Sequence, residues 1–172
     1  MHIILPVKKE VRRSSQTKLD LILILDNVQY ARNVAEIFQL AESFRIREIV
    51  ISGTNPAIPP FGKDLQKASL GSEKVVKWEK TENLPATIKR YRARGYQLLT
   101  YSFAEKAKPV GDLVLKNNKV ILLVGNETNG LSRELLSLAQ QQFYVPTAHR
   151  NGFLNLNLSV AIILSNLFVS AK

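Results

Sequence analysis

Cysteine is absent from the 172 residues, and histidine occurs only twice, as His2 and His149. The chain therefore has no disulfide framework and no thiolate nucleophile. Two histidines are too few for a zinc site built from cysteine and histidine, so we expect no metal. The lack of cysteine fits a reducing compartment, and we expect a cytoplasmic protein.

Long apolar runs and glycine-rich phosphate loops are also missing. The stretch 154–169 is apolar but interrupted by asparagine and serine, and it falls short of the ~20 apolar residues of a membrane span. It predicts a buried helix and no membrane partner. The first apolar run ends in D-N-V-Q-Y-A-R-N, and no G-x-x-x-x-G-K-[ST] sequence occurs. These absences argue against a Rossmann dinucleotide-binding or P-loop nucleotide-binding domain.

Acidic residues are scarce relative to basic ones. The chain has 24 Lys and Arg against 14 Asp and Glu, which gives a net charge of +10 and a pI near 9.9. So large a positive charge on a small chain favours a polyanionic partner, although a merely soluble basic protein is the alternative. The candidate phosphate-contacting residues are Arg12, Arg13, Arg32, Arg90, Arg92 and Arg94.

Apolar runs of strand length alternate with segments of helical periodicity, which indicates an α/β fold with a mainly parallel sheet. We expect strands at 21–25, 47–52, 74–78, 97–102, 119–124 and 144–146, and helices at 33–44, 61–69, 82–94, 133–141 and 154–169. Residues 1–19 form a basic N-terminal extension, and residues 20–172 form one domain. Asn33 followed by Glu36 predicts a capping-box-like pair, and Ser132 predicts a second N-cap.

Two of the expected strands end in polar loops rich in asparagine and glycine. The run 120–124 opens into G-N-E-T-N-G at 125–130, and Y-V-P at 144–146 leads to N-L-N-L-S at 155–159. Ligands of open parallel sheets bind beyond the carboxyl ends of the strands, so these loops are candidate binding segments. Ordinary turns between strands and helices are the alternative, because Asn and Gly also form turns for local reasons.

The same loops carry a family resemblance. V-G-N-E-T-N-G-L-S at 124–132 resembles the second motif of the SpoU (TrmH) family of RNA ribose 2′-O-methyltransferases, in the SPOUT superfamily. Y-V-P with N-L-N-L-S-V-A at 155–161 resembles its third motif, and segment 33–45 resembles its first. There Asn33, Ile37, Ala41 and Phe44 agree, whereas Gln39 stands at the position of the catalytic arginine. The resemblance covers about residues 20 to 170.

This resemblance implies a SPOUT-type, mainly parallel sheet flanked by helices, with a C-terminal deep trefoil knot. It also implies a homodimer, S-adenosylmethionine as the methyl donor, and tRNA or rRNA as the partner. The implied catalytic positions are Asn33, Glu127 and Asn157, with Gln39 replacing the arginine. The implied cofactor-binding residues are Thr100, Tyr101, Gly125, Asn126, Val145, Pro146, Asn155 and Leu156.

Each implied catalytic residue also has a purely local explanation. Asn33 could be a helix N-cap, Glu127 could accept hydrogen bonds from turn amides, and Asn157 could be a helix-start residue. Gln39 is a neutral amide that serves neither as a base nor as a phosphate clamp. Two hypotheses follow: an active enzyme in which Arg32 or Arg45 replaces the arginine, or a catalytically silent SPOUT-fold protein that binds RNA.

Overall fold

The computed structural model describes residues 19–54, 57–148 and 154–171. Within these ranges the strands form one sheet in the order β3-β2-β1-β6-β4-β7-β5, and every neighbouring pair is parallel. The strands are β1 (Asp20–Asp26), β2 (Glu48–Ser52), β3 (Trp78–Thr81), β4 (Gln97–Tyr101), β5 (Lys108–Pro109), β6 (Lys119–Val124) and β7 (Gln141–Tyr144). The helices are α1 (Ala31–Ser43), α2 (Lys63–Ser69), α3 (Leu84–Arg92), α4 (Arg133–Leu138) and α5 (Leu156–Ser170), with short 3-10 turns η1 (Ser72–Lys74) and η2 (Val110–Asp112).

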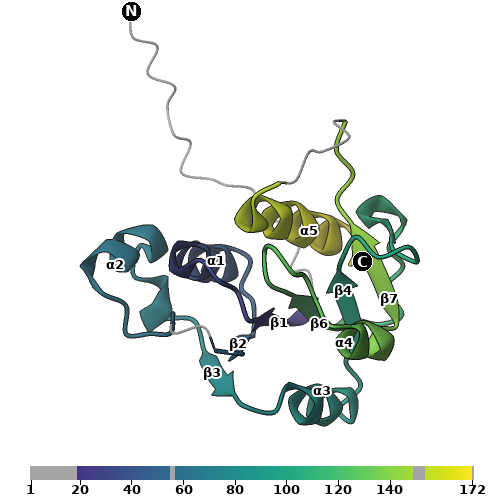
Figure 1. Ribbon diagram of the computed structural model, residues 1–172, viewed down its shortest axis with the longest axis horizontal. Coiled ribbons are helices and arrows are strands. Elements are labelled where there is room, and N and C mark those ends of the chain that lie inside the picture. Colours follow the sequence, from purple (N-terminus) through teal and green to yellow (C-terminus); the bar gives the residue numbers. More distant parts are fainter. Residues whose placement is uncertain (1–18, 55–56, 149–153, 172) are drawn as a thin grey trace, which may run out of the picture.

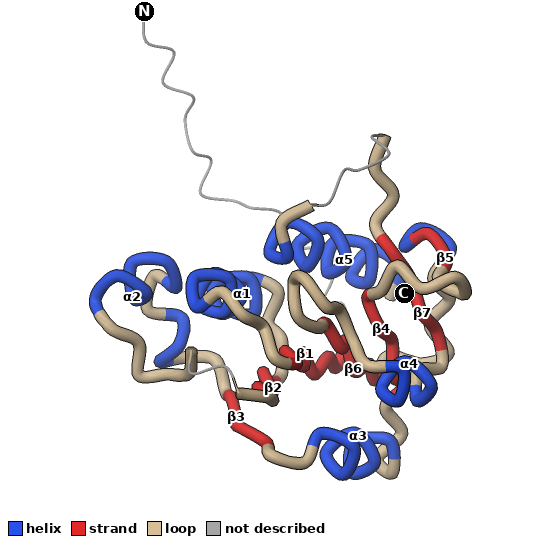
Figure 2. Tube along the Cα trace, viewed as in Figure 1, coloured by secondary structure: helices blue, strands red, loops and turns tan. Residues whose placement is uncertain are grey.

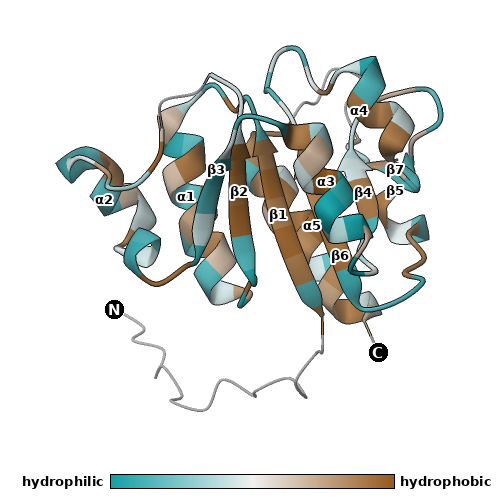
Figure 3. Cartoon of the chain, turned by 90° about the horizontal axis from the view of Figure 1, so that it is seen from below, coloured by the Kyte–Doolittle hydropathy of each residue, from teal (hydrophilic) through white to brown (hydrophobic). Residues whose placement is uncertain are grey.

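Helices cover both faces of the sheet (Figures 1 and 2): α1 and α5 lie side by side on one face, and α3 and α4 lie on the other. Successive side chains of a strand point to opposite faces. Accordingly, Leu21, Leu23 and Leu25 of β1 belong to the core under α1 and α5. Ile22 and Ile24 belong to the core under α3 and α4. A strand buried on both faces reads as a continuous apolar run, and β1 is accordingly hydrophobic in Figure 3 except at its ends, which are Asp20 and Asp26.

The mainly parallel sheet with flanking helices confirms the predicted fold class. The predicted knot stays a prediction, because the connection from β7 to α5 passes through residues 149–153, outside the described residues. The predicted N-terminal extension also lies outside them, apart from its last residue, Leu19. No helix in the described ranges combines the length and apolar character needed to cross a bilayer.

Several element boundaries were predicted wrongly. The strand expected at 144–146 is β7, Gln141–Tyr144, and overlaps the expected range only at Tyr144. The strand expected at 74–78 begins only at Trp78, because Ser72–Lys74 forms a 3-10 turn and pairing with β2 starts at Trp78. The helix expected to reach 141 ends at Leu138. Gln140 there exchanges two hydrogen bonds with Leu98 of β4, one from its backbone and one through its side chain. The chain therefore enters β7 instead of continuing the helix.

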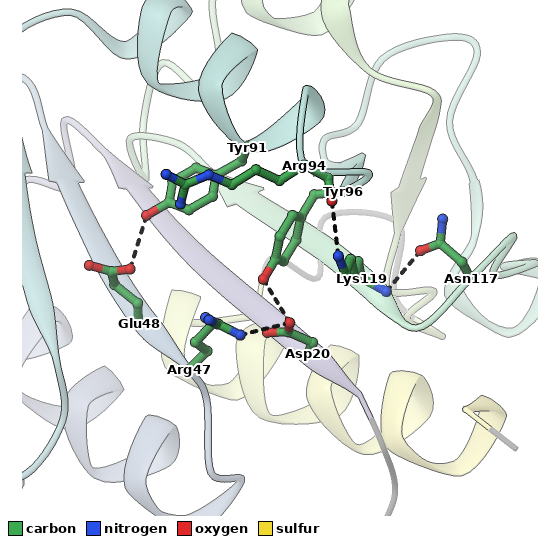
Figure 4. A network of polar contacts seen from close by, with 8 residues as sticks. All are labelled: Asp20, Arg47, Glu48, Tyr91, Arg94, Tyr96, Asn117 and Lys119. Carbon is green, nitrogen blue, oxygen red and sulfur yellow. Dashed lines mark hydrogen bonds and ion pairs between the residues drawn. The ribbon is translucent and has the colours of Figure 1, made fainter.

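A cluster of polar side chains lies at the amino ends of the strands (Figure 4). The Tyr91 hydroxyl donates to Glu48 Oε2 at 3.0 Å, and the Tyr96 hydroxyl donates to Asp20 Oδ2 at 2.7 Å. Arg47 Nη1 binds the same Asp20 oxygen at 2.8 Å. Burial, followed by the adjoining carboxylates, raises the pKa of Tyr91 and of Tyr96 to about 12. These phenols therefore hold their protons more tightly in the folded protein.

We expect the free energy of unfolding to fall as the pH rises from about 10 to about 12, because unfolded tyrosine loses its proton near pH 10. Below that range both tyrosines are protonated in both states, and the stabilisation is complete. Urea unfolding across alkaline pH measures the loss. The Tyr91→Phe, Tyr96→Phe double variant should lose stability less steeply, and an unchanged slope would contradict the assignment.

Candidate functional site

A cavity of about 560 Å³ lies beyond the carboxyl ends of β4 and β6, next to the start of α5. Its volume falls within the range of about 300–1,000 Å³ that is typical of small-molecule sites. Tyr101 at the end of β4, Gly125 after β6 and Leu156 at the start of α5 all contribute to its lining. The Tyr101 hydroxyl hydrogen-bonds Ser159 Oγ at 3.0 Å, which ties β4 to α5, and burial raises the pKa of Tyr101. The cavity lies where parallel sheets generally bind ligands.

The loop after β6 forms one wall of this cavity and folds back on itself. Asn126 Oδ1 accepts from the amides of Thr128 and Asn129, each at 2.9 Å, and the amide of Gly130 donates to Asn126 O at 2.9 Å. A Cβ atom on Gly125 would lie 2.5 Å from Gly130 O. Glycine at 125 is therefore required by a close approach of backbone to backbone.

Glu127 anchors the N-terminus of α1 to this loop. Its carboxylate accepts from the backbone amides of Gln29 at 2.8 Å and Tyr30 at 3.3 Å. It also accepts from Asn33 Nδ2 at 2.7 Å. A carboxylate is well placed there, because the first amides of a helix lack partners and carry partial positive charge. Glu127 does accept from backbone amides, but these belong to a segment 97 and 98 residues away in the sequence, so the purely local explanation is wrong.

Asn33 extends this set of hydrogen bonds to α5. Its Oδ1 accepts from Asn157 Nδ2 at 3.2 Å, and the same amide group donates to Glu36 Oε2. Asn33 and Asn157 are only 6% and 8% exposed. Asn157 Oδ1 is buried and has no hydrogen-bond partner among the described residues. One connected set of side chains thus links the loop after β6, the first turns of α1 and the start of α5.

A second cavity, of about 340 Å³, lies on the other side of this connection. Arg32, Glu36 and Gln39 of α1 line it, together with Asn157. Lys67 and Leu70 line it from α2 and its C-terminal end, and Leu158 and Ala161 line it from α5. Because Asn33 lines the first cavity and Asn157 the second, the hydrogen bond between their side chains joins the two linings.

The implied cofactor residues separate into two groups. Those that line the first cavity are Tyr101, Gly125, Asn126, Asn155 and Leu156. Thr100, Val145 and Pro146 are not on its lining: Thr100 and Val145 are buried in the sheet region, and Pro146 is exposed beyond β7. Their role in binding stays a prediction.

The predicted capping pair at the start of α1 is wrong. Tyr30 is the N-cap, without a side-chain cap, and Asn33 lies inside the first turn, where its side chain faces Glu127 and Asn157. Glu36 pairs with Arg32 and Asn157 instead of returning to the helix N-terminus. The predicted cap at Ser132 is confirmed, since its side chain accepts from the amide of Leu135.

Sequence reasoning also missed residues at the site. Glu36 was considered only as part of a cap, and neither Tyr30 nor Phe103 was considered for the first cavity, although both are more than half exposed and line it. For Glu36 a signal existed, because it follows Asn33 by three residues and so lies on the same side of the helix.

The candidate phosphate-contacting arginines do not form one surface. Arg32 lines the second cavity. Arg90 and Arg94 lie over the Tyr91 ring, at 5.0 and 5.9 Å from its centroid, and Arg90 also pairs with Glu79. Because α3 runs towards the amino end of β4, these arginines and the exposed Arg92 lie at the end of the sheet opposite the cavities. Figure 4 shows Arg94 at that end, beside Tyr91 and Tyr96. Their contact with RNA stays a prediction, and Arg12 and Arg13 lie outside the described residues.

Residues 20–165 match the model of the SpoU rRNA Methylase family, so the chain belongs to this family. It is 23% identical over 162 residues to an uncharacterized tRNA/rRNA methyltransferase of Mycoplasma genitalium, covering 94% of this chain and 66% of that one. It is 23% identical to the tRNA (guanosine(18)-2′-O)-methyltransferase of Aquifex aeolicus, over 84% of this chain and 67% of that one. An AdoMet-bound rRNA methyltransferase from Sinorhizobium meliloti has a similar structure, with a TM-score of 0.78 and 26% identity over 90% of this chain and 60% of that one. The chain therefore spans about two thirds or less of the length of these relatives.

Replacing Glu127 by Gln should lower the free energy of unfolding by about 1–3 kcal/mol. The Gln amide has one acceptor oxygen where the carboxylate has two, and its N–H group would face a backbone or side-chain N–H donor. Urea unfolding measures this change. Glu105→Gln, at an exposed turn position outside the helices, is the matched control and should leave the midpoint in place. Equal midpoints for the two variants would show that the Glu127 anchor contributes nothing.

Proposed function

We propose that this protein is an S-adenosylmethionine-dependent RNA methyltransferase that acts on a ribose 2′-hydroxyl of tRNA or rRNA. The observation that carries the proposal is the pair of adjoining cavities joined by Glu127, Asn33 and Asn157. These are the residues that the family resemblance implies. The Aquifex relative's name specifies 2′-O-methylation of tRNA, and the Sinorhizobium protein binds AdoMet, which supports both halves of the proposal.

The first cavity has the character that the methyl donor requires. Tyr101 and Phe103 provide aromatic surface, with their ring centroids 5.6 Å apart, which suits an adenine ring. The close approach of Gly125 to Gly130 leaves backbone instead of side chain along one wall. The chemistry that S-adenosylmethionine supplies is a methyl group made electrophilic by a sulfonium. This chain's own residues must then hold the acceptor hydroxyl in line and remove its proton.

The polar connection supplies the rigidity that such alignment needs. Asn157 is buried and its amide group is held by Asn33 and Glu36, so its orientation is defined before any ligand binds. Asn33 is held in turn by Glu127. Misplacement of reacting groups by a fraction of an ångström is costly in such reactions. We therefore assign Glu127 a positioning role, with Asn33 and Asn157 closest to the reacting groups.

The proposed reaction is tested by incubating unmodified tRNA and rRNA with the protein and methyl-labelled S-adenosylmethionine. We expect label in 2′-O-methylated nucleosides, recovered after alkaline hydrolysis as dinucleotides, because a 2′-O-methyl group prevents alkaline cleavage at that position. Label confined to methylated bases, or no label in either RNA, would contradict the proposal.

Gln39 defines the main alternative, a protein that binds RNA without catalysis. Gln39 and Arg32 line the same cavity, whereas Arg45 is not on its lining. Arg32 is therefore the better candidate for the missing positive charge. We expect Arg32→Ala to slow single-turnover methylation by about 10²–10³-fold, as loss of one preorganised electrostatic group does, and Arg45→Ala to leave the rate unchanged. An inactive wild type that gains activity through Gln39→Arg would favour the silent alternative.

We also propose that the protein forms a homodimer through α5. Leu158, Ile162 and Val169 of this helix are exposed, while its opposite side is buried against the sheet. A surface helix of a monomer usually shows a single apolar stripe. Light scattering should give twice 19.3 kDa, and Leu158→Lys should shift the mass towards the monomer. A wild type that is monomeric at micromolar concentration would contradict the dimer.

A further inference from the structure

The second cavity contains a carboxylate that the family resemblance does not assign. Glu36 Oε1 accepts from Arg32 Nε at 2.7 Å, and Glu36 Oε2 accepts from Asn157 Nδ2. Its side chain remains 32% exposed. On the part of the second cavity's lining that the structure describes, Glu36 is the one acidic residue. Gln39, at the position of the family's arginine, lies one turn further along the same helix face.

Glu36 is better suited than Glu127 to accept a proton. An ionised carboxylate offers about four acceptor sites. Glu127 uses three of them, for the amides of Gln29 and Tyr30 and the side chain of Asn33. A proton on Glu127 would also disturb its anchor at the start of α1. Among the described residues, Glu36 accepts from Arg32 and Asn157 alone, which leaves room for a substrate hydroxyl.

The rest of the second cavity suits the acceptor strand. Arg32 from α1 and Lys67 from α2 bring positive charge to it, and their side chains are 79% and 82% exposed. Its α5 wall, formed by Asn157, Leu158 and Ala161, is uncharged. The charged residues on the described lining besides Glu36 are thus both cations, Arg32 paired with Glu36 on α1 and Lys67 on α2. They can contact phosphates on either side of a ribose. Histidine and cysteine are absent from the described residues.

We propose that Glu36 is the general base of the reaction, in place of the arginine that this chain lacks; this inference rests on the function proposed above. As the ribose O–H bond breaks, its proton passes to a carboxylate oxygen of Glu36. The hydroxyl oxygen forms a bond to the methyl carbon, and the methyl–sulfur bond breaks with its electron pair left on sulfur. The products are the 2′-O-methyl ribose, a neutral thioether and a protonated Glu36.

Single-turnover methylation at saturating RNA and S-adenosylmethionine tests this role with two substitutions. Glu36→Gln keeps an oxygen for Asn157 but cannot take a proton, and it should lower the rate by about 10²–10⁴-fold. Glu36→Asp keeps the carboxylate and should recover part of the loss. Glu82→Gln removes the same charge at an exposed position on neither cavity lining and should react like the wild type.

Four further readouts separate catalysis from structure. In the wild type the rate should rise with pH on the acidic side as Glu36 ionises, and Glu36→Gln should lose this rise. Calorimetry should give the same affinity for S-adenosylhomocysteine in both proteins, and urea unfolding should show that both are fully folded under the assay conditions. In NMR of the ¹³C-glutamate-labelled protein, the Cδ signal of Glu36 is identified as the one missing from Glu36→Gln. Addition of RNA without cofactor should shift this signal.

A Glu36→Gln variant as fast as the wild type would overturn the assignment. The same holds if the loss of rate follows from weaker cofactor binding or lower stability, or if the acidic pH dependence persists in the variant. If Glu36→Gln keeps the rate and Glu36→Ala loses it, the role of Glu36 is only to hold Asn157. If the wild type methylates neither RNA, the proposed function itself is wrong. If the wild type is active and Glu36→Gln is equally active, only the assignment of Glu36 is wrong.

Discussion

The carboxylate of Glu127 joins the loop after β6 to the N-terminus of α1, and the site depends on that junction. These segments are 97 and 98 residues apart in the sequence at the hydrogen-bonded amides. The sheet makes the contact possible, because β1 and β6 are parallel neighbours and both end at the same edge. Burial of both faces of β1 and β6 supplies the hydrophobic stabilisation. The polar junction then selects one arrangement of the loops at that edge.

From Glu127 the connection continues through Asn33 to Asn157 and Glu36. It separates a larger cavity with aromatic and backbone walls from a smaller one flanked by cations. This division matches the two tasks of a methyl transfer to RNA, which are to hold a small donor and to present a polyanionic acceptor. The buried amide of Asn33 is held at its nitrogen by Glu127 and at its oxygen by Asn157, so it keeps its orientation without ligand. Such preorganisation is what alignment of a hydroxyl with a methyl group demands.

Much of the fold is readable from the sequence, because strands that are buried on both faces appear as continuous apolar runs such as 21–25. The Asn- and Gly-rich segment 125–130 also correctly predicted a loop at the end of a strand. The contacts of Asn33 were not readable: its position before a helical pattern favours a cap, whereas its partners Glu127 and Asn157 are distant in sequence. The location of the basic residues at 90–94 was not readable either, and their contact with RNA stays a prediction. Charge on a helix is visible in the sequence, but which end of the sheet that helix end reaches is decided by chain direction.

Binding of S-adenosylhomocysteine, measured by titration calorimetry, tests the central claim most directly, because it asks whether the larger cavity is a cofactor site without requiring the correct RNA. The wild type should bind one ligand per chain. Gly125→Ala should lose that affinity, because its Cβ would collide with the backbone of Gly130, while Gly111→Ala, with open space around the added carbon, should bind normally. Absence of binding heat from folded wild type at millimolar ligand, or equal binding by Gly125→Ala, would contradict the account.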